Sequence, residues 1–345
     1  MSNRVTLMVA GSLDQRTGGY VYDARMVEAL RRHGFAVDVA QLDGHFPDAC
    51  DVATRAFDQT LDALGDEERI IVDGLVMGAL PASVARHAPR LDITALVHHP
   101  LGDEQGLDEA TSKRLHLSEL EGLSSVSRII VTSGFTAARL EALAKAYGVE
   151  ITAPVSVVEP GVERAPMSPA AAEGEELRLL CVATLTPRKG QDVLVEALSR
   201  VRAEAWRCDL FGGNRDAAFT ERVEGLIARH ELSRVTLHGE CDAATLEAAY
   251  QGAHVLVLPS WYEGYGMVIT EALAHGLPVI TTTGGALAQT LPHDAGLSVA
   301  PGDVEALTTK LECFLSDSEL RHRLREGAIM AREALVDWQA AGDAF

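Results

Sequence analysis

Short apolar runs alternate along the chain with longer, alanine-rich stretches in which apolar residues recur every three or four positions. The short runs are typical of strands buried on both faces, and the periodic stretches, such as Tyr20–His33 and Thr136–Tyr147, are typical of amphipathic helices. This rhythm predicts parallel β-α units. The expected strands are Val5–Ala10, Ala36–Ala40, Ile70–Val72, Ile93–Val97, Ile129–Thr132, Val155–Val158, Leu177–Ala183, Cys208–Phe211, Val235–Leu237, Val255–Leu258 and Val279–Thr282.

The chain length and one break in the rhythm indicate two domains. A stretch at 166–176 is rich in Pro, Ala and Glu and poor in large apolar residues, as a linker would be. The 345 residues also exceed what one ordinary hydrophobic core serves. We therefore expect an α/β protein with two doubly wound domains facing each other across a cleft, at 1–165 and 177–325, followed by a C-terminal helix at 326–345.

The charge balance excludes some partners. Fifty acidic residues against thirty basic ones give a net charge of −20, which argues against a nucleic-acid surface and against binding to anionic lipid. No apolar run approaches the roughly 20 residues of a spanning helix, and the first residues lack a signal-peptide pattern. We expect a cytoplasmic protein without membrane association. The five cysteines form no CxxC pair, so no metal site is expected.

Doubly wound sheets bind ligands beyond the carboxyl ends of their strands, and polar residues follow several of the predicted strands. In the first half, Gly18 and Gly19 precede a helix, where they either expose backbone N–H groups to an anion or simply form a turn. His98 and His99 end another strand just before Pro100. One of them is expected to be a hydrogen bonder or acid–base group facing the cleft, and the other to be exposed.

Two cations in the second half stand where a helix dipole disfavours them. Arg188 and Lys189 follow a strand and precede Gly190 and a helix, whose N-terminus prefers negative charge. A bound polyphosphate would reverse that preference. A solvated basic turn is the alternative interpretation.

The stretch WYEGYGMVITEALAHGLPVI places Glu263 in a loop after a strand and Glu271 in the following helix. Gly264 and Gly266 expose amides at the start of that helix, where phosphate binds readily. Carboxylates accept hydrogen bonds from sugar hydroxyls. Two acids flanking an anion site therefore indicate a sugar nucleotide, whereas the alternative, two acids favoured by the helix start, leaves the glycines unexplained.

These motifs resemble the retaining glycosyltransferases of family 4, which have the GT-B fold. The resemblance is specific in the E-x7-E motif and the Gly-Leu-Pro-Val-Ile that follows, and it extends to VHHP, VTSGFTAARL, VEPGVE and LTPRKG. Two positions depart from the family pattern: Gln289 stands where an acid is expected, and Glu159 replaces the usual Asn.

The resemblance implies a role for each matching residue. Arg188 and Lys189 would neutralise the donor diphosphate, Glu263 would contact the transferred sugar, and Glu271 would hold the ribose hydroxyls. The other implied contacts are Tyr265, Gly266 and Met267 to sugar and phosphate, Gly19 to the diphosphate, and His98 in the cleft with His99 in reserve. Leu237, His238 and Gly239, in a segment expected to follow a strand, would lie near the nucleobase.

The implied reaction is transfer of a hexosyl group from a nucleotide-diphosphate sugar to a small-molecule or glycan acceptor, with retention of configuration. UDP-sugar is the favoured donor and GDP-mannose the alternative, and neither a cofactor nor a metal is expected. The C-terminal helix would cross back to the first domain. A GT-B subunit that binds a nucleotide sugar or a partner without catalysis is the alternative function, and the sequence leaves the acceptor and the oligomeric state open.

Overall fold

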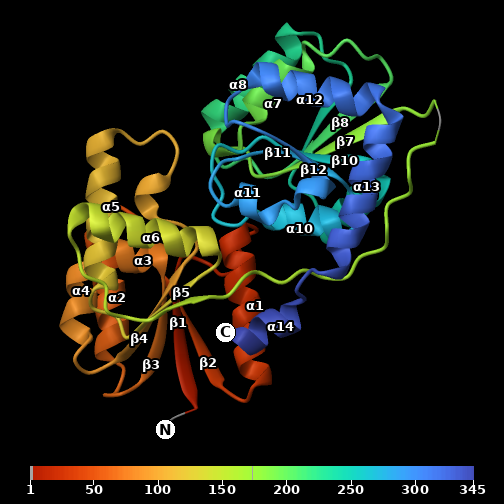
Figure 1. Cartoon of the computed structure of the whole chain (residues 1–345). Coiled ribbons are helices and arrows are strands. Elements are labelled where there is room, and N and C mark those ends of the chain that lie inside the picture. The colour runs from red at the N-terminus through yellow and green to blue at the C-terminus, as the bar shows by residue number, and fades with distance from the viewer. Residues whose placement is uncertain (1–2, 173) are drawn as a thin grey trace. The chain divides into compact units, whose positions relative to one another are not determined.

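The computed structural model describes residues 3–172 and 174–345, which form two units (Figure 1). The first unit runs to Gly161 and also contains Trp338–Phe345, and the second spans Val162–Asp337. Each unit is built on one six-stranded, entirely parallel sheet with helices on both faces. The expected α/β class with two doubly wound sheets is confirmed.

The sheet of the first unit has the strand order β2-β1-β3-β4-β5-β6. The chain therefore leaves β1 toward one edge of the sheet and continues from β3 toward the other. Its strands are β1 (Arg4–Ala10), β2 (Ala36–Leu42), β3 (Arg69–Asp73), β4 (Asp92–Val97), β5 (Arg128–Val131) and β6 (Val155–Val157). Its helices are α1 (Gly18–Arg32), α2 (Asp51–Asp62), α3 (Gly74–Ala79), α4 (Pro81–His87), η1 (Leu101–Asp103), α5 (Glu109–Leu123), α6 (Gly134–Tyr147) and α14 (Trp338–Ala344).

The second sheet has the order β12-β11-β10-β7-β8-β9, so the chain turns back between β7 and β10. Its strands are β7 (Leu177–Val182), β8 (Trp206–Phe211), β9 (Val235–Gly239), β10 (Val255–Leu258), β11 (Val279–Thr282) and β12 (Gly296–Val299). Its helices are η2 (Pro187–Lys189), α7 (Gln191–Leu198), α8 (Ala217–Arg229), α9 (Ala243–Gly252), α10 (Met267–Ala274), α11 (Leu287–Thr290), η3 (His293–Ala295), α12 (Val304–Ser316) and α13 (Ser318–Glu333).

Both sheets are buried on their two faces, which explains the continuous apolar runs in the sequence. In β1, Leu7 and Val9 pack toward α1, whereas Met8 and Ala10 belong to the core on the opposite face. Strand β10 shows the same division, because Val257 and Leu258 lie in two different cores. Burial on both faces fixes these strands in the middle of their sheets and places the ends of β1 and β10 where side chains can converge.

The C-terminal segment differs from the single predicted helix. It forms α13 and α14, and the chain is extended between them, where Val162 N donates to Val336 O at 2.9 Å. That backbone bond takes the place of helix continuation. Helix α14 packs on α1 within the first unit (Figure 1), and a Cβ added to Gly342 would lie 2.4 Å from Ala29 Cβ.

Two further features differ from expectation. Strand β12 was not predicted, because its sequence Gly-Leu-Ser-Val contains only two large apolar residues. The described residues of the stretch at 166–176 form no helix or strand, but they are bonded within the second unit: Ser168 is buried, and its hydroxyl donates to Gln251 O at 3.0 Å.

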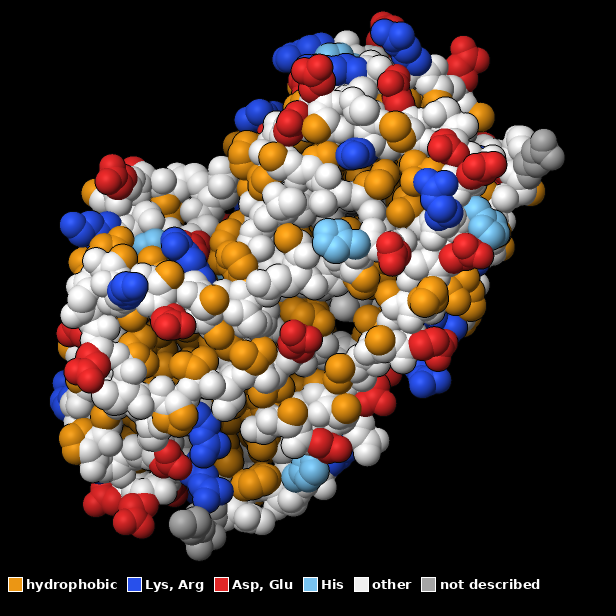
Figure 2. Space-filling view, viewed as in Figure 1, with side chains coloured by type: hydrophobic (Ala, Val, Ile, Leu, Met, Phe, Trp, Pro, Cys, Tyr) orange, Lys and Arg blue, Asp and Glu red, His pale blue; other side chains and the backbone are white. Residues whose placement is uncertain are grey.

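On the face shown in Figure 2, Lys and Arg side chains stand singly or in small groups among acidic ones. Among the described residues, none of the helices combines the length and the apolar character that crossing a membrane requires.

Candidate functional site

The loop after β7 and the loop after β10 meet at the switch point of the second sheet. The two strands are neighbours, but the chain continues from β7 toward β8 and from β10 toward β11. Loops that diverge in this way leave a crevice beyond the carboxyl ends of the strands, where doubly wound sheets bind their ligands. Arg188 and Lys189 lie on η2 after β7, and Glu263 lies in the loop after β10.

The structure brings these three charged side chains together. Lys189 Nζ lies 2.6 Å from Glu263 Oε1, and Arg188 Nη1 lies 3.1 Å from Glu263 Oε2. Arg188 Nη1 also donates to Tyr262 O at 2.8 Å. The cationic side chains are only 18% and 17% exposed. The group thus carries two positive charges and one negative charge, largely withdrawn from water.

Glycine and backbone bonds hold η2 against the β10 loop. Gly190 has φ 67°, and a Cβ there would lie 2.4 Å from Pro259 O. Trp261 N donates to Arg188 O at 2.8 Å. A residue with a side chain at position 190 would therefore be strained and would push the two cations away from Glu263.

Glu263 remains ionised in this setting. Burial alone would raise the pKa of its carboxyl, but Lys189 and Arg188 outweigh burial and lower the pKa to about 2. Ser260 Oγ donates to Oε1 at 2.7 Å and adds to the effect. Glu263 is therefore a hydrogen-bond acceptor and a counter-charge, and it does not serve as a proton donor near neutral pH.

Glu271 lies on α10, whose N-cap is Gly266 with φ 94°. Its Oε2 accepts a hydrogen bond from Tyr250 Oη at 2.7 Å, and burial raises the pKa of the carboxyl. The Tyr250 ring stacks on His275 with a centroid distance of 4.7 Å. Tyr250 thus fixes one carboxylate oxygen of Glu271.

The remaining predicted residues of this unit fall into two groups. Gly264, Tyr265, Gly266 and Met267 form the end of the β10 loop and the start of α10, next to Glu263. Leu237, His238 and Gly239 were expected to follow a strand, which is wrong: they lie within β9 at the sheet edge. There His238 stacks on Phe211 with ring centroids 4.3 Å apart, and its Nε2 lies 2.7 Å from Asp209 Oδ1.

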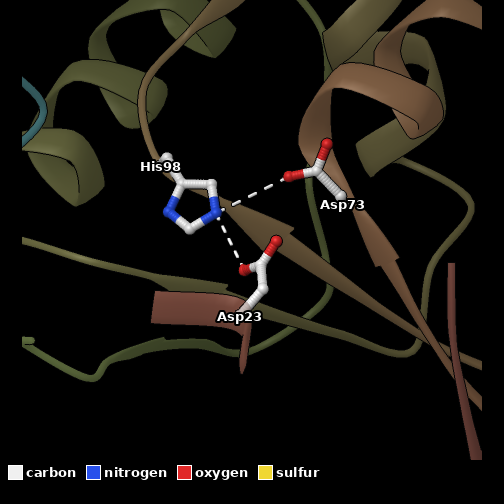
Figure 3. A group of neighbouring side chains, drawn as sticks. All are labelled: Asp23, Asp73 and His98. Atoms are coloured by element: carbon white, nitrogen blue, oxygen red, sulfur yellow. Dashed lines mark hydrogen bonds and ion pairs between the residues drawn. The ribbon is translucent and has the colours of Figure 1, made fainter. Parts of the chain in front are cut away.

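The switch point of the first sheet holds a different group (Figure 3). His98 follows β4, and its Nε2 lies 3.0 Å from Asp23 Oδ1 and 3.6 Å from Asp73 Oδ2. Asp23 comes from α1, and Asp73 ends β3 and accepts a bond from Leu75 N at 3.0 Å. Helix α1 follows β1, and Asp73 is the last residue of β3. These two neighbouring strands are the pair at which the chain reverses its direction across the sheet.

This group combines two acids with one imidazole. Burial, followed by the charge of Asp23, raises the pKa of Asp73 to about 7. Burial lowers the pKa of His98, but the two carboxylates outweigh it, Asp23 most of all, and the net direction is upward. One nitrogen or oxygen atom from each residue lies within 4.8 Å of the others.

The other predicted residues of the first unit surround this group. Gly18 begins α1, and a Cβ on Gly19 would lie 3.2 Å from His98 Cδ2, so the missing side chain makes room for the imidazole. His99 has a separate partner, since its Nε2 lies 3.4 Å from Glu104 Oε2. The two histidines therefore occupy different surroundings.

Four side chains that bond to the predicted site residues were not themselves predicted from the sequence: Asp23, Asp73, Tyr250 and Ser260. A usable signal existed for Asp23, because a carboxylate between Tyr22 and Met26 interrupts the apolar face of a helix. Asp73 directly follows a strand, the position that marked the other candidates. Tyr250 and Ser260 read as ordinary helix and loop residues, and their partners become visible only in the fold.

Parts of the chain match known proteins. Residues 166–330 match the family model described as "Glycosyl transferases group 1". The sulfoquinovosyl transferase SQD2 of Arabidopsis thaliana is 37% identical over 110 residues, covering 31% of this chain and 21% of that protein. The D-inositol 3-phosphate glycosyltransferase of Jonesia denitrificans is 30% identical over 197 residues, covering 50% of this chain and 46% of that protein. The chain thus spans less than half the length of either relative.

Solved structures match along almost the whole chain. Sucrose-phosphate synthase from Thermosynechococcus elongatus has a TM-score of 0.81 at 23% identity, covering 98% of this chain and 96% of that one. Anabaena Alr3699/HepE, in complex with UDP-glucose, has a TM-score of 0.74 at 15% identity, covering 99% and 97%. Residues 166–330 are thus similar to group 1 glycosyl transferases, and the structural match shows that the whole chain has the GT-B fold.

Proposed function

We propose that the chain is a retaining glycosyltransferase that moves a hexosyl group from a nucleotide-diphosphate sugar to an acceptor hydroxyl. The observation that carries this proposal is the half-buried pair of cations, Arg188 and Lys189, at the switch point beside the N-terminus of α10. The family match covers the unit that contains this pair.

A diphosphate fits this group because its negative charge complements the positive charges of Arg188 and Lys189. Both cations bond the carboxylate of Glu263, and the N-terminus of α10 lies in the same loop region, where phosphate binds readily. A phosphate at this position would accept hydrogen bonds from Arg188 and Lys189 while Glu263 keeps both side chains in place. Glu263 would then contact the sugar, and Glu271 the ribose.

The proposed chemistry uses charge rather than a metal. As the bond between the anomeric carbon and the phosphate oxygen breaks, negative charge grows on the diphosphate, and the cations stabilise it. Losing one such donor typically costs about 2.7–4 kcal/mol of transition-state stabilisation. In the front-face route, the departing phosphate oxygen takes the proton of the acceptor hydroxyl, and the acceptor oxygen bonds the anomeric carbon on the face just vacated.

On this proposal the first unit binds the acceptor, with His98 as the catalytic hydrogen bonder, His99 as its reserve and Gly19 beside His98. The UDP-glucose complex of HepE, a protein of similar fold, supports a UDP-sugar as donor. GDP-mannose is the alternative donor to be compared in the same assay.

A ligand screen followed by kinetics tests the proposal. A nucleoside diphosphate present at about 100 times its dissociation constant stabilises the protein by about 2.7 kcal/mol, so a thermal-shift panel of UDP, GDP and their sugars should identify the donor. Arg188→Ala should then lower turnover at least about tenfold. Arg323→Ala is the control, because Arg323 is an exposed residue of α13.

Two outcomes would overturn the proposal. If no nucleoside diphosphate or nucleotide sugar raises the unfolding temperature, the donor site is absent. If UDP binds but UDP-glucose is neither hydrolysed nor transferred to any acceptor in a panel of sugars and polyols, the chain is a binding subunit. The anomeric configuration of the product, read by proton NMR, decides between retention and inversion.

A further inference from the structure

The imidazole of His98 is occupied on one side only (Figure 3). Its Nε2 faces Asp23 Oδ1 at 3.0 Å and Asp73 Oδ2 at 3.6 Å. Its Nδ1 points away from both carboxylates and bonds to no described residue. The ring therefore turns one nitrogen toward the acids and leaves the other for a ligand.

Within this group the side chain of Asp23 bonds to His98. Its side chain is 2% exposed, and its hydrogen bond to His98 is the one side-chain bond it makes to the described residues. A carboxylate so far from water is tolerated only beside a compensating charge. Asp73, by contrast, also caps α3 through Leu75 N. Asp23 is therefore the acid whose position is explained by His98 alone.

The other side chains around the His98 ring carry no charge. On α1, Tyr22 meets His98 edge-on with ring centroids 5.5 Å apart, and its hydroxyl donates to Val158 O. The hydroxyls of Thr132 and Thr136 donate to the backbone O of His98. All three neighbours are neutral, so the two carboxylates are the charged groups that face the ring.

We infer that Asp23 is a positioning residue that keeps His98 an imidazolium, with its Nδ1–H directed outward as a charged hydrogen-bond donor. The bond at Nε2 fixes the orientation of the ring, and the buried negative charge favours the protonated form. Asp73, which lies further from Nε2, can then hold a proton of its own.

The kinetic consequence rests on the proposed glycosyltransferase function. In that reaction His98 is the catalytic hydrogen bonder, and a charged donor bonds a substrate oxygen roughly twice as strongly as a neutral one. The charge state and orientation of His98 belong to the free protein, however, and can be measured without any substrate.

NMR of protein labelled with ¹⁵N-histidine provides that measurement. We expect both ring nitrogens of His98 to be protonated at pH 7 and the titration midpoint to lie above that of free histidine. In Asp23→Asn, which keeps the size of the side chain and removes its charge, the midpoint should fall by about half a pH unit or more. Asp343→Asn is the matched control, since Asp343 pairs with the exposed His33 at 2.8 Å, and it should leave His98 unchanged.

Each outcome of this titration decides the inference. A wild-type ring that is neutral at pH 7, or an Asp23→Asn midpoint equal to that of the wild type, overturns it. If Asp23→Asn fails to fold, the wild-type spectrum alone decides.

A kinetic measurement separates this inference from the proposed function. With UDP-glucose as donor, Asp23→Asn should lower kcat at least about tenfold while KM changes little. As pH is raised, turnover of Asp23→Asn should begin to fall at a lower pH than turnover of the wild type, because the His98 ring loses its proton at a lower pH. If the wild type turns over no donor, the proposed function fails, while the titration still tests Asp23.

Discussion

The two sheets reverse direction at equivalent points, but the charge gathered there has opposite sign. At β7 and β10, two cations surround one carboxylate. At β1 and β3, two carboxylates surround one imidazole. A switch point therefore supplies a place for chemistry without prescribing which chemistry it will be.

The difference shows how each unit stabilises its buried charges. In the second unit the carboxylate is the minority charge, so its pKa falls to about 2 and it remains ionised. In the first unit burial, followed by the charge of Asp23, raises the pKa of Asp73 to about 7. The first group buffers protons near neutrality, and the second presents fixed positive charge.

Among these substitutions, removing Glu263 should have the largest effect on the free energy of unfolding. Glu263→Ala leaves Arg188 and Lys189 half-buried without their shared counter-charge, and breaking a buried ion pair in this way costs roughly 3–5 kcal/mol. Urea unfolding should show this loss of stability. A loss below about 1 kcal/mol would mean that the cations reach water and that the group is not preorganised.

The matching substitution in the first unit should be milder. Asp73→Asn removes an acid that already holds a proton near neutral pH, so it should cost far less than Glu263→Ala in the same urea experiment. An equal or larger loss would contradict the description of Asp73 as the acid in excess.

The pH dependence of stability should differ between the groups. The pKa of Glu263 is lowered in the fold, so its contribution is complete above its unfolded pKa and is lost as pH falls toward about 2. The pKa of Asp73 is raised, so the folded state binds the extra proton, and stability declines as pH rises from about 4 toward 7. Unfolding midpoints between pH 5 and 7 should decline less in Asp73→Asn than in the wild type. Parallel curves would refute this assignment.

The single hydrogen bond between Tyr250 and Glu271 should matter least. Tyr250→Phe removes the hydroxyl that bonds Glu271 at 2.7 Å, at a cost of about 1 kcal/mol. We expect a correspondingly small loss of nucleotide affinity, because Glu271 stays in place on α10. A loss of affinity as large as that of Arg188→Ala would mean that Tyr250 contacts the ligand itself.

The sequence predicted the architecture well because the strands are buried on both faces and so appear as apolar runs. Strand β12 escaped because two of its four residues are Gly and Ser, and its pairing with β11 comes from the fold rather than from its own side chains. The break between α13 and α14 depends on a backbone bond to Val162, which no local pattern reveals.

The candidate site was predictable where its residues lie in the loops that follow strands. Arg188, Lys189 and Glu263 stand out in this way, although their mutual contact does not, since 74 positions separate Lys189 from Glu263. Asp23 was missed because it lies one turn inside a helix, and its partner His98 is 75 positions away. Sequence spacing therefore indicated the loops that meet, and only the fold showed which charges they pair.

Calorimetric titration with UDP tests the central claim most directly, because it measures whether the cations after β7 receive a diphosphate. The account predicts that UDP binds the wild-type protein and that the double variant Arg188→Ala, Lys189→Ala binds it at least about tenfold more weakly, with Arg323→Ala unchanged. Equal affinity in the wild type and the double variant would contradict it.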